Sequence, residues 1–218
     1  MADQRRQPRS RPETLARRRD ILDAAVEIFG SKGFAGGTLQ EIADQVGMTH
    51  AGILHHFGSK DQLLLEVLQH RDETDVADLE EKHIPDGMPL FRHLVRTAFV
   101  NAHRAGIVQA YAVLSAESVT DDHPGRAFFE KRYSTLRSEV AHAFEVVCAE
   151  RGITAPDTIA NASTSILAVM DGLQVQWLLA PDAVDLAHAS EFAIEAIVAA
   201  VLSPQPSPLA EPAASAKA

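Results

Sequence analysis

The sequence predicts an all-α protein with a small N-terminal three-helix domain followed by a larger helical body. Apolar residues recur at helical spacing in every long segment, and clusters of glycine and proline separate these segments. The strict alternation of apolar and polar residues that is typical of strands is nowhere sustained. With 218 residues, of which 46% are hydrophobic, the chain is long enough to bury a core in one or two domains.

The first element is a helix expected from Glu13 to Gly30. One apolar stripe runs along it and consists of Ile21, Leu22, Ala25, Ile28 and Phe29. Residues 1–12, which precede the helix, are rich in arginine and are expected to form a flexible basic arm.

The stretch from Thr38 to Phe57 predicts a helix, a tight turn and a second short helix. Thr38 and Glu41 form a capping box, so the first of these helices should begin at about Leu39 and end at Gly47. Thr49 is placed to cap the next helix, whose inner side carries Ile53 and Phe57. Many proteins enter the major groove of DNA with this arrangement. The alternative interpretation is a helical hairpin that only packs in an all-α core.

Two neighbouring features favour the DNA-binding interpretation. Gly52 stands inside a helix, where glycine is costly, and close approach to another backbone would explain it. Ser59, Lys60, Asp61 and Gln62 form a second capping box, which places Lys60 at a helix N-terminus where a phosphate is favoured.

The run RRRDILDAAVEIFGSKGFAGGTLQEIADQVGMTHAGILHHFGSKDQLL, from Arg17 to Leu64, resembles the DNA-binding domain of the tetracycline-repressor (TetR) family of bacterial regulators. The positions that match this family's pattern are Ile21, Leu22, Ala24, Ala25, Phe29, Gly33, Phe34, Thr38, Ile42, Ala43, Gly47, Phe57, Lys60 and Leu63. The resemblance implies a helix-turn-helix domain over residues 13–58 and a helical ligand-binding and dimerisation domain over residues 59–203.

The resemblance also implies roles for single residues in DNA binding. It implies that Thr38 and Lys60 contact phosphates and that Thr49, His50 and Ala51 face bases. Leu54 stands where the family usually carries a tyrosine, so a phosphate contact from that hydroxyl is in doubt. The predicted DNA-binding residues are Thr38, Thr49, His50, Ala51, Leu54, His55 and Lys60.

The charge is unevenly divided along the chain. Residues 1–60 carry a net charge of +2, whereas residues 61–218 carry −12, which together give the overall −10. Arginines concentrate near the N-terminus, at Arg5, Arg6, Arg9, Arg11, Arg17, Arg18 and Arg19. Such an arm can follow DNA phosphates or lie in the minor groove. The alternative is a solvated tail without a partner.

The body is predicted to be helical throughout. The expected helices run from Ser59 to about Lys82, Leu90 to His103, Ile107 to Ser118, Arg126 to Glu150, Pro156 to about Leu179, and Val184 to Leu202. Residues 204–218, rich in proline, alanine and serine, are expected to be a disordered tail.

The last two helices indicate a subunit interface. From Phe192 to Leu202 only Glu195 is charged, and a helix that is apolar nearly all round must be buried on more than one side. The two helices are expected to pack on their symmetry copies as a four-helix homodimer interface. Its predicted residues are Leu167, Leu178, Phe192, Ala196, Ile197 and Ala200. The alternative is a deeply buried helix in a monomer. Two-fold symmetry implies a palindromic operator.

The resemblance further implies a pocket for a small-molecule effector in the body. Its predicted lining residues are Phe99, Tyr111, Phe128, Met170, Asp171, Gln174 and Trp177, and Phe91, Phe129 and Tyr133 are further candidates. Asp171 is the most informative, because an unpaired carboxylate in an apolar segment is costly. It therefore meets a partner side chain or faces a polar or cationic ligand.

Several other classes of function are disfavoured. Cys148 is the single cysteine, the N-terminus lacks the apolar stretch of a secretory signal, and no apolar run reaches the roughly 18 residues of a membrane span. We therefore expect a cytoplasmic protein without disulfides. Nucleophile motifs, phosphate-binding glycine loops and metal-ligand spacings are not found, so we expect neither an enzyme nor a metal or other cofactor.

The sequence thus predicts a dimeric transcriptional regulator, in the form of a repressor that a small-molecule effector releases from a palindromic operator in double-stranded DNA. The alternatives are an activator with the same DNA-binding head and, less favoured, an all-α enzyme or carrier. A separate hypothesis is that protonation of His50 or His55 strengthens phosphate contacts near pH 6.

Overall fold

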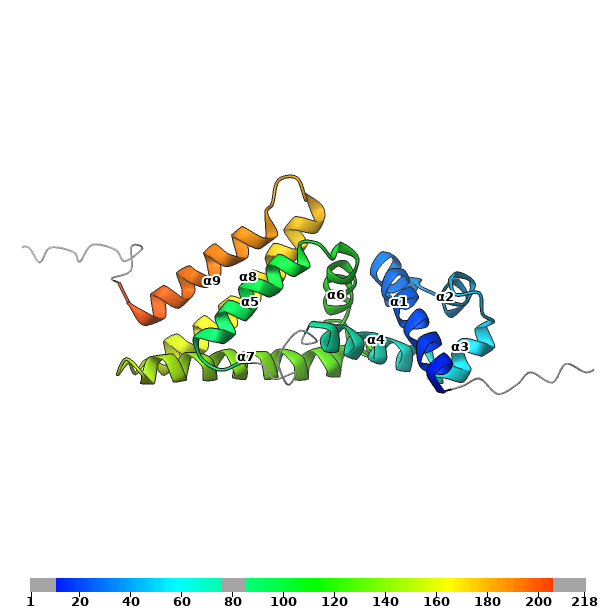
Figure 1. Cartoon of the computed structure of the whole chain (residues 1–218), viewed down its shortest axis with the longest axis horizontal. Coiled ribbons are helices and arrows are strands. Elements are labelled where there is room, and N and C mark those ends of the chain that lie inside the picture. Colours follow the sequence, from blue (N-terminus) through cyan, green and yellow to red (C-terminus); the bar gives the residue numbers. More distant parts are fainter. Residues whose placement is uncertain (1–10, 76–84, 206–218) are drawn as a thin grey trace, which may run out of the picture.

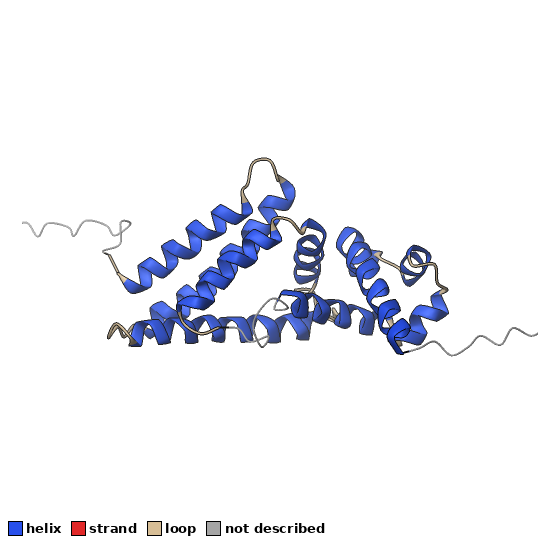
Figure 2. Ribbon diagram, in the orientation of Figure 1, coloured by secondary structure: helices blue, strands red, loops and turns tan. Residues whose placement is uncertain are grey.

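The computed structural model describes residues 11–75 and 85–205, and every regular element within these ranges is a helix (Figure 2). The nine helices in this part of the chain are α1 Arg11–Gly36, α2 Leu39–Gln45, α3 His50–Phe57, α4 Lys60–Asp75, α5 Met88–Asn101, α6 Ala105–Glu117, α7 Arg126–Ala149, α8 Pro156–Leu179 and α9 Leu186–Leu202. The predicted all-α fold is confirmed. None of the described helices combines the length and apolar character that a membrane span requires.

The helices form two groups along the long axis of the molecule. Figure 1 shows α1, α2 and α3, which we call the head, at one end and α5, α7, α8 and α9 at the other, with α4 and α6 between them. α1 packs on α2, α4 and α6, and α9 packs on α5 and α8. The arrangement therefore joins the head to the body through α4 and α6.

The head encloses a tightly packed apolar core. Ile21, Phe29, Ile42 and Ile53 are fully buried, and the same cluster continues through Leu63 and Leu64 of α4. Tyr111, Leu114 and Phe129, which belong to α6 and α7, complete it. The apolar core of the head thus extends beyond residue 58 and includes side chains of the body.

The body has its own core, between α5, α7, α8 and α9. Phe91 and Phe144 lie at its centre, with ring centroids 4.5 Å apart. Ile166 contributes from α8 and Ile194 from α9, and both are almost fully buried. The single cysteine, Cys148, is buried in this core.

Most predicted helix boundaries agree with the structure to within two residues. The first helix is an exception, because it continues past Gly30 to Gly36 with a break at Gly33, where φ is 71°. The predicted helix from Ser59 is described as far as Asp75. Its expected continuation to Lys82, like most of the basic arm and of the C-terminal tail, lies outside the described residues.

Candidate nucleic-acid interface and ligand cavity

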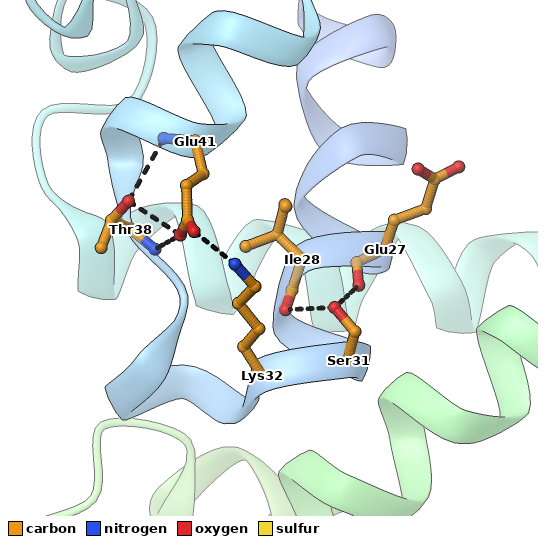
Figure 3. Close-up of polar contacts among 6 residues, drawn as sticks. All are labelled: Glu27, Ile28, Ser31, Lys32, Thr38 and Glu41. Carbon is orange, nitrogen blue, oxygen red and sulfur yellow. Dashed lines mark hydrogen bonds and ion pairs between the residues drawn. The ribbon is translucent and has the colours of Figure 1, made fainter.

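The capping box at the start of α2 is present. The Thr38 hydroxyl accepts a hydrogen bond from the Glu41 backbone N–H at 3.2 Å, and the Glu41 carboxylate accepts one from the Thr38 N–H at 2.9 Å (Figure 3). Lys32 of α1 forms an ion pair with the same carboxylate. The hydrogen bond from Lys32, followed by those from Thr38, lowers the pKa of Glu41 to about 2. The carboxylate therefore fixes the start of α2 to α1.

The helix α3 presents one side to the core and the other to solvent. Its N-cap, Thr49, accepts a hydrogen bond from the Gly52 N–H at 3.1 Å, while Ile53 and Phe57 anchor the inner side. The exposed residues are Thr49, His50, Ala51, Leu54 and His55. These five predicted DNA-binding residues thus lie together on an uncovered surface of the head. Leu54 is 36% exposed. It therefore presents an apolar side chain at the position where the TetR family usually carries a tyrosine hydroxyl.

The explanation expected for Gly52 is wrong. A Cβ at this position would lie 3.1 Å from the Met48 Cε and 3.3 Å from the Thr49 hydroxyl, and no second backbone approaches it within 4 Å. Gly52 therefore makes room for side chains of the turn itself.

Lys60 begins α4, three residues after the end of α3. Its ammonium lies 4.5 Å from the ring centroid of Phe34, a cation–π contact that holds the side chain against α1. Ser59 caps the same helix, since its hydroxyl accepts a hydrogen bond from the Gln62 N–H at 3.0 Å. An ammonium held at a helix N-terminus is suited to a phosphate.

Two of the arginines near the N-terminus, Arg17 and Arg18, make contacts within the folded head. Arg18 donates to the His56 carbonyl, pairs with Glu66 of α4 and lies 4.3 Å from the ring centroid of Phe57. Arg17 donates to the Val46 carbonyl at 3.3 Å. They tie α1 to the ends of α2 and α3 and to α4. Arg5, Arg6 and Arg9 lie outside the described residues.

The body contains a cavity of about 660 Å³. One face of α5 lines it with Leu90, His93, Leu94, Thr97 and Asn101. The remaining lining residues are Arg71, Asp72, Pro85, Asp86, Tyr111, Arg132, Tyr133, Leu136, Ser138, Glu139, Val140, His142, Leu167, Met170, Asp171 and Gln174. This volume is in the range of sites that hold small organic molecules.

The predicted pocket residues divide into two groups. Tyr111, Met170, Asp171 and Gln174 line the cavity, whereas Phe99, Phe128 and Trp177 do not. Phe99 instead lies against His188 of α9, with ring centroids 5.3 Å apart. Phe128 packs against the core of the head, and Trp177 is half-buried outside the cavity. Of the additional candidates, Tyr133 lines the cavity, while Phe91 and Phe129 are packed in the two cores.

The lining includes polar residues that the sequence did not single out. Arg132 donates to the Tyr111 hydroxyl at 3.2 Å and pairs with Asp72. The Arg71 guanidinium lies 4.1 Å from the Tyr111 ring centroid. These arginines stand in amphipathic helices, where arginine is ordinarily a solvent-exposed residue, so the sequence carried no signal that they face a cavity.

Asp171 forms a hydrogen bond with a side chain of the same protein and also lines the cavity. The Tyr133 hydroxyl donates a hydrogen bond to its carboxylate at 2.6 Å. Burial raises the pKa of Asp171, although this hydrogen bond and the charges of Arg71 and Arg132 act in the opposite direction. Burial, followed by the influence of Tyr111 and Asp171, also raises the pKa of Tyr133. The two alternatives for Asp171 are therefore not exclusive.

Asn101 presents an unpaired donor at the end of α5. Its side chain is 1% exposed, and its Oδ1 accepts a hydrogen bond from Arg104 at 2.8 Å, which fixes the orientation of the amide. The Nδ2 group has no hydrogen-bond partner among the described residues. A buried donor without a partner costs about 1–3 kcal/mol, so this amide is suited to a ligand acceptor.

The outer face of α8 and α9 remains exposed in the single chain. Phe192 is 75% exposed and Leu179 is 82% exposed, while Ala196 and Ala200 lie on the same open side of α9 as Phe192. Leu178 and Ile197 are half-buried. Leu167 is not part of this face, because it is 8% exposed and lines the cavity. Its burial within the single chain does not favour its predicted place in the dimer interface.

A capped helix-turn-helix with exposed polar side chains on its second helix defines a class of DNA-binding proteins. The chain belongs to the tetR family of bacterial regulatory proteins, whose N-terminal model matches residues 21–67. The C-terminal model of BetI-type transcriptional repressors matches residues 90–203. The protein is therefore a DNA-binding transcriptional regulator, of a family that does not consist of enzymes.

Relatives and solved structures agree with this assignment. The HTH-type transcriptional regulator BetI of Brucella canis is 28% identical over 191 residues, which cover 88% of this chain and 94% of that protein. SmeT, the repressor of the Stenotrophomonas maltophilia multidrug efflux pump SmeDEF, has been solved with triclosan. That structure has a TM-score of 0.70 and 18% identity, and it covers 90% of this chain and 100% of SmeT.

A transcriptional regulator from Saccharomonospora viridis, solved in complex with choline, has a TM-score of 0.67 and 22% identity. The match covers 84% of this chain and 96% of that one. At these identities the solved structures establish the fold.

Proposed function

We propose that the protein is a homodimeric repressor that binds a palindromic operator. We further propose that a small-molecule effector releases it from the operator by binding in the cavity of the body. The observation that carries this proposal is the position of α4. α4 begins at Lys60, three residues after the end of α3 at Phe57, and Arg71 and Asp72 of the same helix line the cavity. A ligand that displaces α4 at the cavity would therefore also shift the head.

On the DNA side, we propose that Thr38 and Lys60 contact phosphates and that Thr49, His50, Ala51, Leu54 and His55 meet base edges. Phosphate contacts fix the position of a protein on DNA, whereas contacts to base edges select the sequence. Leu54 offers an apolar contact, which suits the methyl group of thymine better than a phosphate.

Dimerisation is supported by the exposed apolar side chains of α8 and α9. Phe192, Ala196 and Ala200 project from the open side of α9, and an exposed patch of this kind typically marks an interaction site. A two-fold axis through this face would place two heads on two half-sites of one palindrome. Repression is favoured over activation because the body matches the C-terminal model of BetI-type repressors. Because a regulator must reach the DNA that it controls, we also propose a cytoplasmic location.

For the effector, the lining supports a small organic molecule with an apolar part and a polar part. Leu94, Leu167 and Met170 would contact the apolar part, and Asn101 would donate to an acceptor. The Asp171 carboxylate would balance a positive charge. Choline, the ligand of the Saccharomonospora viridis regulator, is therefore the first compound to test.

The test begins with selection of bound sequences from randomised duplexes, followed by measurement of affinity by fluorescence anisotropy. We expect one palindrome to be enriched and its affinity to fall with salt. Lys60→Gln should weaken binding to all duplexes alike and reduce the salt slope by about 1. Enrichment of no palindrome would overturn the proposal.

The effector is then sought by adding choline and other metabolites to the complex with the selected operator. Release by one of them, and loss of that release in Asn101→Leu without loss of operator binding, would support the cavity as the effector site. An effector whose action is unchanged in Asn101→Leu and in Asp171→Asn would place the effector site elsewhere.

A further inference from the structure

The head and the body meet where α1 crosses α6. Gly30 faces Ala110 so closely that a Cβ on the glycine would lie 3.1 Å from the Ala110 backbone. Three residues later the helical path of α1 breaks at Gly33, where φ is 71° and ψ is 173°. Because the backbone leaves the helix here, the N–H of Phe34 needs an acceptor from outside α1.

Glu117, the last residue of α6, supplies that acceptor. Its carboxylate accepts a hydrogen bond from the Phe34 N–H at 2.7 Å. The same carboxylate fills the space beside Gly33, where a Cβ would lie 2.9 Å from the Glu117 Cδ and closer still to Oε1. Only glycine combines this conformation with room for the carboxylate. The break in α1 and the end of α6 therefore form one fitted joint.

Phe34 connects this joint to the core of the head and to Lys60 of α4. Its ring packs against Phe29 of the core at a centroid distance of 5.7 Å and meets the edge of His123 at 5.4 Å. The ammonium of Lys60 lies 4.5 Å from the same ring. One residue thus contacts the body through its backbone and a proposed phosphate-binding side chain through its ring.

We propose that Glu117 is a positioning residue that holds the head at a fixed orientation on the body by binding the backbone of Phe34. The proposal rests on the proposed function, because the orientation matters only if two heads of one dimer read one palindrome. A single head on a half-site needs no fixed orientation. Two heads bind a palindrome tightly only when the body holds them at the spacing of the half-sites.

The expected effect therefore differs between two DNA duplexes. In Glu117→Ala, we expect binding to the selected palindrome to weaken roughly tenfold, in the range of typical couplings between sites. Binding to a duplex with one half-site should stay within about twofold. Glu117→Gln keeps an oxygen acceptor for Phe34 and should retain most of the preference for the palindrome. Loss of a negative charge alone would strengthen DNA binding, whereas we expect Glu117→Ala to weaken it.

The experiment measures the affinity of the full-length wild type and three variants for both duplexes at one salt concentration. Glu150→Ala removes an exposed carboxylate at the end of α7 and serves as the control for charge. Hydrogen exchange at the Phe34 amide is measured on the same samples without DNA. We expect it to become roughly tenfold faster in Glu117→Ala, and to change little in Glu117→Gln and Glu150→Ala.

The outcomes separate the two proposals. Equal losses on both duplexes would show a destabilised head and would overturn the positioning role, as would a Glu117→Ala variant that keeps the wild-type preference. Unchanged exchange at Phe34 would overturn the joint itself. If the wild type binds both duplexes equally, the proposal of a dimer that binds a palindrome is overturned, and the positioning role with it. If the wild type prefers the palindrome and the Glu117 variants keep that preference, the proposed function stands and only the positioning role is overturned.

Discussion

The head and the body of this protein differ in how completely they fill their interiors. The head packs Ile21, Phe29, Ile42 and Ile53 into a core with no measurable exposure. Polar contacts of α1 side chains join this helix to α2, α3 and α4. The body surrounds a cavity of about 660 Å³ with charged and aromatic side chains. A closed core suits a surface that must match DNA in one geometry. A cavity with a polar lining suits a domain whose helices shift when a ligand binds in the cavity.

The largest expected effect compares the same substitution at Leu63, an α4 residue in the apolar core of the head, and at Leu167, in the wall of the cavity. Leu63→Ala removes a fully buried side chain from the closed core and should lower the free energy of unfolding by about 4 kcal/mol. Leu167→Ala, at the cavity wall, should cost about 2 kcal/mol, because fewer packed neighbours surround the removed atoms. Urea denaturation followed by circular dichroism at equal protein concentration gives both values. Equal costs would contradict the difference in packing.

The next effect tests whether Arg18 belongs to the closed head. Arg18→Ala removes the contacts with the His56 carbonyl, Glu66 and Phe57, and should destabilise the protein by about 2 kcal/mol. The neighbouring Arg19 is exposed, so Arg19→Ala should change the free energy of unfolding by less than about 0.5 kcal/mol. Similar values for the two variants would contradict the contacts of Arg18 within the head.

A smaller effect concerns the pH dependence of the body. Because burial raises the pKa of Asp171 in the folded state, the folded protein holds this proton at a pH where the unfolded chain has lost it. Stability from this group is complete below the unfolded pKa of 3.8 and is lost as the pH rises through the folded pKa.

Asp171→Asn removes this dependence. Its stability relative to the wild type should therefore increase as the pH rises above about 4, as measured by urea denaturation at a series of pH values. Asp182→Asn, in the exposed loop after α8, is the matched control for the loss of a carboxylate. A constant difference between Asp171→Asn and the wild type would argue against a raised pKa of Asp171 in the folded protein.

The smallest effect is the opposite dependence in the head. Lys32 and Thr38 lower the pKa of Glu41 from 4.5 to about 2, so its stabilising contribution is present above pH 4.5 and is lost as the pH falls toward 2. Glu41→Gln should be less stable than the wild type at pH 6, and the difference should shrink on acidification. Glu150→Gln controls for loss of an exposed charge. A difference that grows toward low pH would contradict the capping role.

The head could be predicted from the sequence almost element by element. The Thr38–Glu41 capping box, the stop near Gly47, the Thr49 cap and the inward positions of Ile53 and Phe57 all stand in the structure as predicted. Each depends on residues within four positions of one another, so the interaction is written in the local sequence. The role of Gly33 was not predicted, because its partner, Glu117, lies 83 residues away from Phe34 in the chain.

The sequence predicted the helices of the body, but it predicted only part of the lining of the cavity. Tyr111, Met170, Asp171 and Gln174 line the cavity as expected, whereas Arg71, Arg132 and Asn101 were missed. Periodicity identifies the apolar face of a helix, but it does not show whether that face meets a packed neighbour or a cavity. Phe99 and Leu167 illustrate this limit, because one packs toward α9 and the other toward the cavity.

The sequence by itself determined the helices, their caps, the outward side of α3 and the kinship with the TetR family, since these depend on short-range patterns and on the order of residues. Only the tertiary structure decided which polar groups surround the cavity, that Arg18 is a contact within the head, and that Glu117 fits against Gly33. The physical reason is that helix crossings bring together residues far apart in the chain. Their pairing depends on the relative positions of whole helices, which no local pattern encodes.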